Sequence, residues 1–234
     1  MENRFNSSRA FGKAIAALFE SILLLLTLLF AVVFCGCKKE FDYLPYVSEL
    51  RSNVLLAKED NFTLRVYAVN KEYPYAADGV PHKTAPRIEA YFTAPEGKEN
   101  CRIYFTVDGK EYGGDMSYDN VKAAYFFSCG LDISTVEILP CRVEYGERTL
   151  TLNTTSIRQK DTLTAKEILK ALQTVEGELF TSLTDQYGFA GEIHIRLIYE
   201  ENPYYYIGVI DRSGKAHAFL LNAQTGKLLA KRTN

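Results

Sequence analysis

The stretch Cys101–Lys110, with the sequence CRIYFTVDGK, decides the fold that we expect of this chain. Apolar and polar side chains alternate along it, with the apolar ones at Cys101, Ile103, Phe105 and Val107. A period of two is typical of a β-strand with one buried face. Asp108-Gly109 follows directly, and an Asp-Gly pair supplies the positive φ angles of a type I′ turn. The stretch therefore predicts a strand that turns back tightly into a β-hairpin.

The same alternation recurs on both sides of this stretch. It is found at Phe62–Ala68, Ile88–Thr93, Leu139–Tyr145 and Leu150–Leu152. Glu144–Arg148 contains a glycine and reads as a second tight turn, and Pro74–Pro86 reads as a long loop. Several short antiparallel strands over about 110 residues are typical of a β-sandwich, so we expect an immunoglobulin-like sandwich over residues 48–156.

The period changes after a linker at Ile157–Asp161. Thr164 and Glu167 form a capping box, and apolar residues then recur every three or four positions, which predicts one helix over Ala165–Leu183. Strands are expected at Glu192–Tyr199, Tyr204–Ile210, Lys215–Leu221 and Lys227–Lys231. One helix on an antiparallel sheet makes residues 157–234 a small α+β unit, and the whole fold class is β-rich α+β.

The final strands carry a resemblance to a known family. Tyr204–Leu229 ends in the sequence NAQTGKL at Asn222–Leu228, which resembles the Asp-Ala-x-Thr-Gly-x-hydrophobic ending of the PepSY domain, with Asn222 in place of Asp. Asn222 can cap the turn, and Gly226 supplies a positive φ. The resemblance implies a non-catalytic exported module of the kind found in protease pro-segments and in membrane-anchored regulators.

The N-terminal stretch Ala14–Cys37 predicts where the protein works. Basic residues precede a nearly uninterrupted apolar run, as in an export signal, and they favour a cytoplasmic N-terminus. The sequence FCGC at Phe34–Cys37 resembles a bacterial lipoprotein signal, which implies acylation of Cys37 and cleavage before it. An uncleaved transmembrane helix and a cleaved secreted protein remain as alternatives, and Glu20 makes a span longer than Ser21–Phe34 costly.

These observations predict four segments. Residues 1–37 are the export signal or membrane anchor, 38–47 a tether, 48–156 the sandwich and 157–234 the PepSY-like domain. The bulk of the chain is then expected to lie outside the cell membrane, held there by a lipid or a helix, in the cell envelope of a bacterium.

Charge and cysteine content restrict the class of protein. The formal net charge is −2 without a long block of one sign, which argues against a nucleic-acid partner. Three cysteines follow the anchor, namely Cys101, Cys129 and Cys141, and their spacing suggests no metal site. They are expected either to be small buried residues or, if two of them pair, to join Cys101 to Cys141.

Candidate chemical groups are few and scattered. His194 and His217 fall on strands expected to be neighbours, and His82 lies in the long loop. Other candidates are a calcium loop at Asp115, Asp119 and Asp132, and a nucleophile turn at Ser128-Cys129-Gly130, but neither has the spacing that its chemistry requires. We therefore expect no catalytic residue, metal or cofactor, and Cys37 is the one site residue predicted.

Tyr204, Tyr205 and Tyr206 form an aromatic stripe in which Tyr205 should point away from the other two. One side of that strand could expose rings to a peptide or glycan, although ordinary sheet packing would explain the stripe equally. The sequence thus favours a non-enzymatic, membrane-tethered protein that binds or regulates an envelope protease or peptide. A cell-envelope hydrolase and a structural spacer are the alternatives.

Overall fold

The computed structural model describes residues 41–72, 80–95 and 99–233. Tyr43–Asn234 forms one compact unit, and Met1–Asp42 is a separate one. The predicted anchor and the lipid attachment site Cys37 lie outside the described residues. In the part that is described, no helix combines the length and the apolar character needed to cross a membrane.

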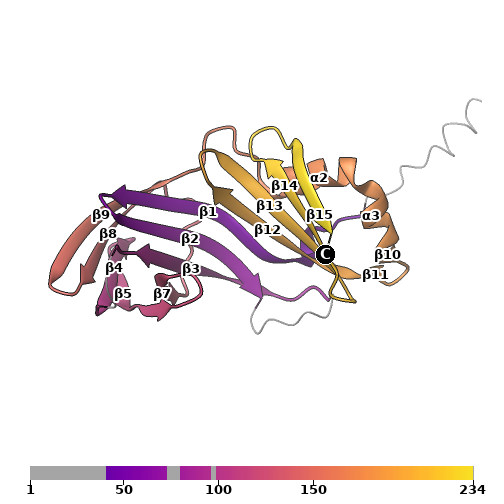
Figure 1. Cartoon of the computed structure of the whole chain (residues 1–234). Coiled ribbons are helices and arrows are strands. Elements are labelled where there is room, and N and C mark those ends of the chain that lie inside the picture. The colour runs from indigo at the N-terminus through magenta and orange to yellow at the C-terminus, as the bar shows by residue number, and fades with distance from the viewer. Residues whose placement is uncertain (1–40, 73–79, 96–98, 234) are drawn as a thin grey trace, which may run out of the picture. The chain divides into compact units, whose positions relative to one another are not determined.

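The compact unit is built almost entirely of strands (Figure 1). A short 3-10 helix, Leu44–Tyr46, precedes them. The strands in the first part are β1 (Val47–Glu59), β2 (Phe62–Glu72), β3 (Thr84–Thr93), β4 (Cys101–Val107), β5 (Lys110–Asp115), β6 (Ser117–Asp119), β7 (Ala124–Cys129), β8 (Ile138–Tyr145) and β9 (Arg148–Ser156). Helices α2 (Ala165–Val175) and α3 (Gly177–Ser182) follow, and then strands β10 (Thr184–Asp185), β11 (Gly188–Phe189), β12 (Gly191–Tyr199), β13 (Pro203–Asp211), β14 (Ala216–Asn222) and β15 (Leu228–Thr233).

Strand β1 holds the unit together because it has two different neighbours on one edge. Its first half pairs in parallel with β12, from Val47 opposite Ile193 to Arg51 opposite Arg196. Its second half pairs with β9, where Leu55 lies opposite Ser156. The other edge pairs with β2 along most of its length. We call the stretch at residues 51–55, where the neighbour changes, the fork.

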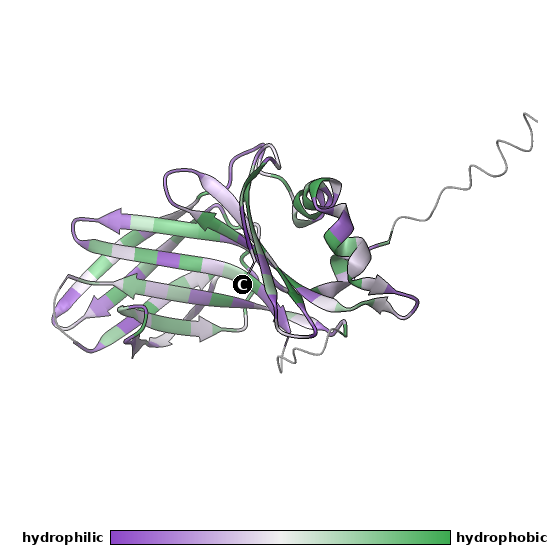
Figure 2. Ribbon diagram, turned by 45° about the vertical axis from the view of Figure 1, so that its right-hand side comes forward, coloured by the Kyte–Doolittle hydropathy of each residue, from purple (hydrophilic) through white to green (hydrophobic). Residues whose placement is uncertain are grey.

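Beyond the fork the strands curl into a nearly closed, barrel-like antiparallel sheet in the order β5-β4-β8-β9-β1-β2-β3-β7-β6. Alternate residues along most of β2, β3, β4 and β8 are buried in it, and Figure 2 shows hydrophobic and hydrophilic residues alternating along several arrows. The interior contains Leu64, Ile88, Ile103 and Val143, each without exposed surface. Burial of this apolar set is the main force that closes the sheet.

The hairpin expected from the sequence is confirmed. Strands β4 and β5 pair with Val107 opposite Lys110. Asp108 and Gly109 between them have φ angles of 51° and 75°, as a type I′ turn requires. Cys101–Lys110 therefore forms strand β4 and the following turn of the barrel-like sheet.

The second part extends the sheet from the other side of the fork, in the order β1-β12-β13-β14-β15. Thr164 and Glu167 form the expected capping box at the start of α2. Gly226, after β14, has a φ of +69°, and a Cβ there would lie 2.8 Å from the Cβ of Ala171 on α2. The turn after β14 therefore packs tightly against α2, and only glycine fits.

Two parts of the expected fold class are wrong. The chain is mostly β, and its first part is a nearly closed sheet rather than the two packed sheets of an immunoglobulin-like sandwich. The predicted helix over Ala165–Leu183 is two helices, because Glu176 leaves the helical region with φ −119° and ψ 31°. The strands after it continue the sheet of β1, so the described residues do not form the PepSY-like arrangement of one helix on its own sheet.

The suggested pairing of Cys101 with Cys141 is also wrong. Both thiols are buried, as expected of inward strand positions, but Cys101, Cys129 and Cys141 are all free. Cys141 lies opposite Phe105, four residues along β4 from Cys101. At about 3.4 Å per residue and about 5 Å between strands, their Cα atoms are roughly 14 Å apart, beyond the reach of a disulfide.

Candidate functional site

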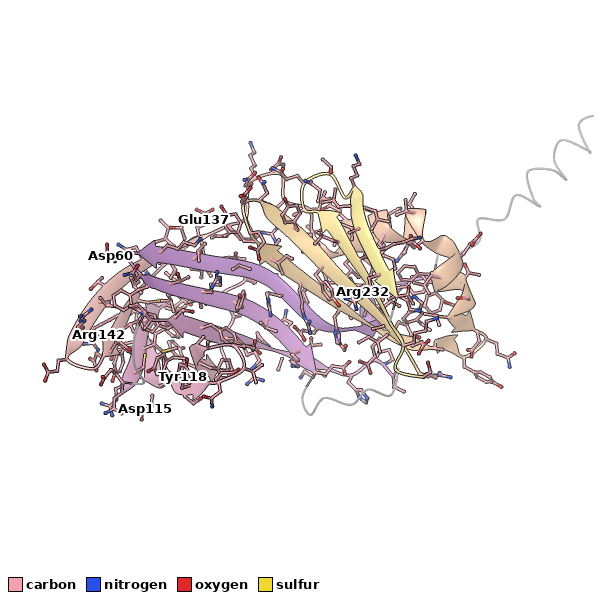
Figure 3. All side chains as sticks on the ribbon, in the orientation of Figure 1. Asp60, Asp115, Tyr118, Glu137, Arg142 and Arg232 are labelled. Carbon is pink, nitrogen blue, oxygen red and sulfur yellow. The ribbon has the colours of Figure 1, made fainter. Side chains whose placement is uncertain are left out.

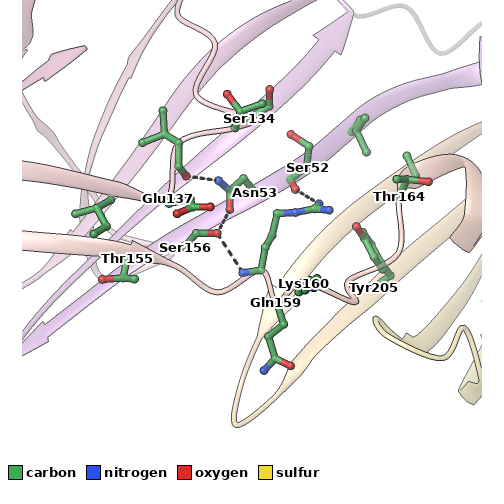
Figure 4. Close-up of a pocket in the computed structure, with 16 residues that line it drawn as sticks. Ser52, Asn53, Ser134, Glu137, Thr155, Ser156, Gln159, Lys160, Thr164 and Tyr205 are labelled. Carbon is green, nitrogen blue, oxygen red and sulfur yellow. Dashed lines mark hydrogen bonds between the residues drawn. The ribbon is translucent and has the colours of Figure 1, made fainter. Parts of the chain in front are cut away.

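A cleft of about 790 Å³ opens beside the fork (Figure 4). Ser52 and Asn53 of β1 contribute to it, Ser134–Ile138 form part of one wall, and Thr164 with Tyr205 lie on the other side. The residues after β9, up to Lys160, run along it. The cleft therefore lies between the barrel-like sheet and the part that contains α2 and β13.

Hydrogen bonds inside the protein occupy most of the buried polar groups of this cleft. Asn53 Nδ2 donates to the carbonyl of Val136 at 2.8 Å, and Asn53 Oδ1 accepts from Ser156 Oγ at 2.7 Å. Arg158 donates from Nη1 to the carbonyl of Ser52 at 2.8 Å. Tyr205 donates its hydroxyl to the carbonyl of Leu163 at 2.8 Å. The Asn53 and Arg158 bonds fix β1, the end of β9 and the loop before β8 to one another, the Tyr205 bond lies within the second part, and we interpret both as structural.

A cluster of charged residues lies where β12 pairs with β1. Arg196 donates from Nε and Nη2 to the two oxygens of Glu49 at 2.7 and 2.8 Å. Lys71 Nζ lies 3.9 Å from Glu49, and His194 Nε2 lies 4.0 Å from Glu192. The bidentate Arg–carboxylate pair is the strongest of these contacts and fixes β12 against β1.

The electrostatics of this cluster follow from its burial. Burial of Glu49 opposes ionisation, but the hydrogen bonds and charge of Arg196 outweigh that effect and lower the pKa of the Glu49 carboxyl. Burial and then the charge of Arg196 lower the pKa of His194. Glu49 is thus a carboxylate held by an ion pair and His194 tends to be neutral, an arrangement that supports structure more readily than acid–base catalysis.

A band of aromatic and cationic side chains crosses the sheet face that is opposite the barrel interior. We define the aromatic–cationic band by its members, which are Phe126, Tyr91, Tyr67, Arg51, Arg196 and Tyr206. Residues directly opposite each other in a sheet share a face, and Tyr91 lies opposite Phe126 while Arg196 lies opposite Tyr206. The band therefore runs over six consecutive strands, from β7 through β3, β2, β1 and β12 to β13.

Contacts link the members of the band in two groups, Phe126 to Arg51 and Arg196 to Tyr206. The ring centroids of Tyr91 and Phe126 are 5.0 Å apart, and those of Tyr67 and Tyr91 are 5.7 Å apart. The guanidinium carbon of Arg51 lies 4.0 Å from the ring centroid of Tyr67. Arg196 lies 5.8 Å from that of Tyr206. Cations at such distances are attracted by the ring faces, so the band is a preorganised surface.

A groove of about 390 Å³ lies along the middle of the band. Its described lining includes three cations, Arg51, Arg65 and Lys122, and one carboxylate, Glu200. Lys122 donates to the hydroxyl of Tyr91 at 2.6 Å and lies 4.1 Å from its ring centroid. Positive charge beside aromatic rings is suited to a ligand with negative groups. We call this the Arg51 groove.

The two histidines considered as a candidate pair do not approach each other. His194 on β12 and His217 on β14 are separated by β13. His194 lies opposite Gly208, and His217 lies opposite Val209, so the two rings point to opposite faces. His82 is exposed, away from both. No group of three or more His, Cys, Asp or Glu residues suited to a metal ion is found in the described ranges.

The other candidates from the sequence have structural partners. Asp115 accepts from Arg102 Nε at 2.6 Å, Asp119 accepts from the amides of Val121 and Lys122, and Asp132 accepts from the amide of Ser134. Ser128 lies within strand β7 rather than at a sharp turn, and its hydroxyl accepts from Arg87 Nε. The calcium loop and the nucleophile turn therefore have no support among these contacts.

The tyrosine stripe is placed as the sequence predicted. Tyr205 is buried, while Tyr204 and Tyr206 lie half-buried on the other face of β13. The sequence did not reveal the rest of the band, although its members Tyr67, Arg51 and Tyr91 occupy the polar positions of alternating strands. Aromatic and basic residues at these outward positions were the one feature of the sequence that could have indicated the band.

Comparison with family models, with curated proteins and with solved structures finds no match for this chain.

Proposed function

We propose that this chain is a membrane-tethered, extracytoplasmic and non-catalytic binding protein that holds a protein or peptide of the cell envelope on its aromatic–cationic band. One observation carries the proposal, namely that the band brings six aromatic and cationic side chains from six neighbouring strands together on one face. Aromatic residues and arginine are enriched where proteins bind one another.

The location of the chain is the second part of the proposal. It is supported by the basic residues and apolar run of Met1–Phe34 and by Gly36-Cys37, which resembles a lipoprotein signal. Tethering a binding face near its partner raises the effective concentration of the pair, so a modest intrinsic affinity would suffice. A Cys37→Ala variant tests this part, because loss of acylation should leave the full-length precursor. Unchanged mobility and membrane association would contradict lipid attachment.

Photo-crosslinking in intact cells tests the binding face. A benzoyl-phenylalanine residue replaces Tyr206 or Phe126, which lie at the two ends of the band, in the full-length chain. The control replaces Tyr187, a strongly exposed tyrosine in the turn between β10 and β11. We expect discrete crosslinked products from both band positions and not from the control position. Equal crosslinking at Tyr187, or none at the band, would overturn the proposal.

A further inference from the structure

We infer that the Arg51 groove recognises an acidic peptide segment of the partner through the carboxylates of Asp or Glu side chains. This inference rests on the proposed function and names the chemistry of the ligand at the same face. It is based on the hydrogen-bonding state of Arg51 and Arg65, on a second arginine–tyrosine pair elsewhere in the chain, and on the form of the groove.

Arg51 carries an unused donor beside the groove. Its Nε atom is buried and makes no hydrogen bond among the described residues, although its guanidinium carbon lies 4.0 Å from the ring centroid of Tyr67. A buried polar group without a partner is rare in folded proteins and asks for an explanation. A ligand acceptor that enters the groove would satisfy this donor.

Arg65 adds a second available cation. It lies on β2, two residues from Tyr67 on the same face and directly opposite Tyr91 of β3. No ion pair involves Arg51 or Arg65 within the described ranges, although both line the same groove. Two guanidinium groups without ion-pair partners in the described part of the chain, on either side of Tyr67 on one face, are complementary to two or more negative side chains.

A second arginine–tyrosine pair in the same chain shows what a satisfied arrangement looks like. Arg142 on β8 lies 4.4 Å from the ring centroid of Tyr104, close to the distance of Arg51 from Tyr67. Unlike Arg51, Arg142 also has two carboxylates nearby, Glu111 and Glu144, each at 3.8 Å. Figure 3 labels Arg142 in the barrel-like part. The carboxylates that the chain supplies to Arg142 are what a ligand would supply to Arg51.

The shape of the groove favours a peptide over an anionic membrane surface. Arg51 and Arg65 are half-buried between strands and rings, whereas a flat lipid surface would best contact protruding side chains. A side-chain carboxylate of an extended peptide can reach between the rings and accept from Nε and Nη of one guanidinium. Lys122 at the edge and the neutral hydroxyl of Tyr91, whose pKa is raised by burial, complete the lining.

Fluorescence anisotropy tests the inference with the full chain in detergent. The probe is a fluorescein-labelled short peptide of alternating Glu and Ser, and the control probe has Gln in place of Glu. We expect the Glu peptide alone to bind, with an affinity that falls as salt is added. Arg51→Gln and Arg65→Gln should each weaken binding roughly tenfold or more, because each removes charge-assisted hydrogen bonds. The control Arg142→Gln should leave binding unchanged.

Three results would overturn the inference. The first is equal binding of the Glu and Gln peptides, and the second is an equal loss in the Arg142→Gln variant. The third is Arg51-dependent binding of phosphatidylglycerol vesicles without binding of the Glu peptide. Arg51→Lys, which keeps the charge and the stem, guards against misfolding, and we expect it to bind less tightly than the native chain. If the Glu peptide fails while crosslinks at Tyr206 persist, the proposed function stands and only the acidic ligand is wrong.

Discussion

Asn53 offers the sharpest test of what holds β9 and the loop before β8 against β1 at the fork. It lies on β1 at the fork, next to a register shift between Arg51 and Asn53, and only 1% of its surface is exposed. Its side chain connects the strand to the loop before β8 through Val136 and to the end of β9 through Ser156. We expect the Asn53→Ala variant to fold but to be markedly less stable.

The size of the effect follows from the contacts that are lost. Two short hydrogen bonds disappear, at 2.8 and 2.7 Å, and each contributes about 1 kcal/mol net. The half-buried Ser156 hydroxyl also loses its acceptor, and truncation leaves a small void, which together add about 1 to 2 kcal/mol. The free energy of unfolding should therefore fall by about 2 to 4 kcal/mol.

Urea denaturation of the full chain in detergent measures this change, with tyrosine circular dichroism as the signal because the chain has 16 Tyr and no Trp. The matched control is Ser134→Ala, which lines the same cleft and whose hydroxyl makes no hydrogen bond in the described part of the chain. The control should change the unfolding free energy by less than about 0.5 kcal/mol. An Asn53→Ala variant as stable as the control would refute the view that this network holds the fork together.

Three other predictions concern single positions. Folding lowers the pKa of His194, so the protein should be fully stable above the unfolded-state pKa of about 6.5 and should lose stability as the pH falls through the folded-state pKa. Denaturation curves of a His194→Asn variant at several pH values should lack this part of the pH dependence. Gly226→Ala should lower the free energy of unfolding by about 2 to 4 kcal/mol, because the new Cβ combines a φ of +69° with a close contact to Ala171. The control Gly214→Ala, where a Cβ would meet no atom within 4 Å, should lower it by only about 1 to 2 kcal/mol. Thermal unfolding measures both changes. Burial raises the pKa of Cys141 to about 12, so iodoacetamide should alkylate it at neutral pH only after denaturation, as mass spectrometry of the labelled chain would show; rapid labelling of the folded chain would contradict its burial.

Local features of the fold could be predicted from the sequence because they depend on neighbouring residues. The Asp108-Gly109 hairpin, the capping box of Thr164 and the orientation of Tyr205 are all confirmed. The turn at Asn222 is also as expected, since its side chain accepts from the amides of Gln224 and Thr225. These signals depend on turn angles and on strand periodicity, which act over a few residues.

The fold class was missed because β1 was not recognised as a strand. Its sequence, Val47–Glu59, contains two register irregularities, one between Val47 and Glu49 and one between Arg51 and Asn53. Each inserts a residue and shifts the inward and outward positions, so no regular alternation is visible. Without β1 the sequence predicts two separate domains, an immunoglobulin-like sandwich and a small α+β unit, instead of one continuous sheet.

The aromatic–cationic band could not be predicted from the sequence for a related reason. Arg51 and Arg196 become neighbours through a parallel pairing between strands some 145 residues apart in the chain, as their residue numbers show. The pairing depends on the burial of Val47 against Ile193 and on the Glu49–Arg196 ion pair, neither of which a local pattern reveals. Residues from six strands share this face only because β1 joins the two parts.

The sequence by itself determined the regularly alternating strands, their inward-facing residues and the tight turns of this protein, because period-two burial and turn angles are properties of short segments. It also carries the export-like N-terminal stretch, from which the location is proposed. The tertiary structure decided the rest. The bulges of β1 let one strand pair with two neighbours on the same edge. This shared strand joins the barrel-like part to strands β12–β15 in a single sheet and places Arg51, Tyr67 and Arg196 on one face.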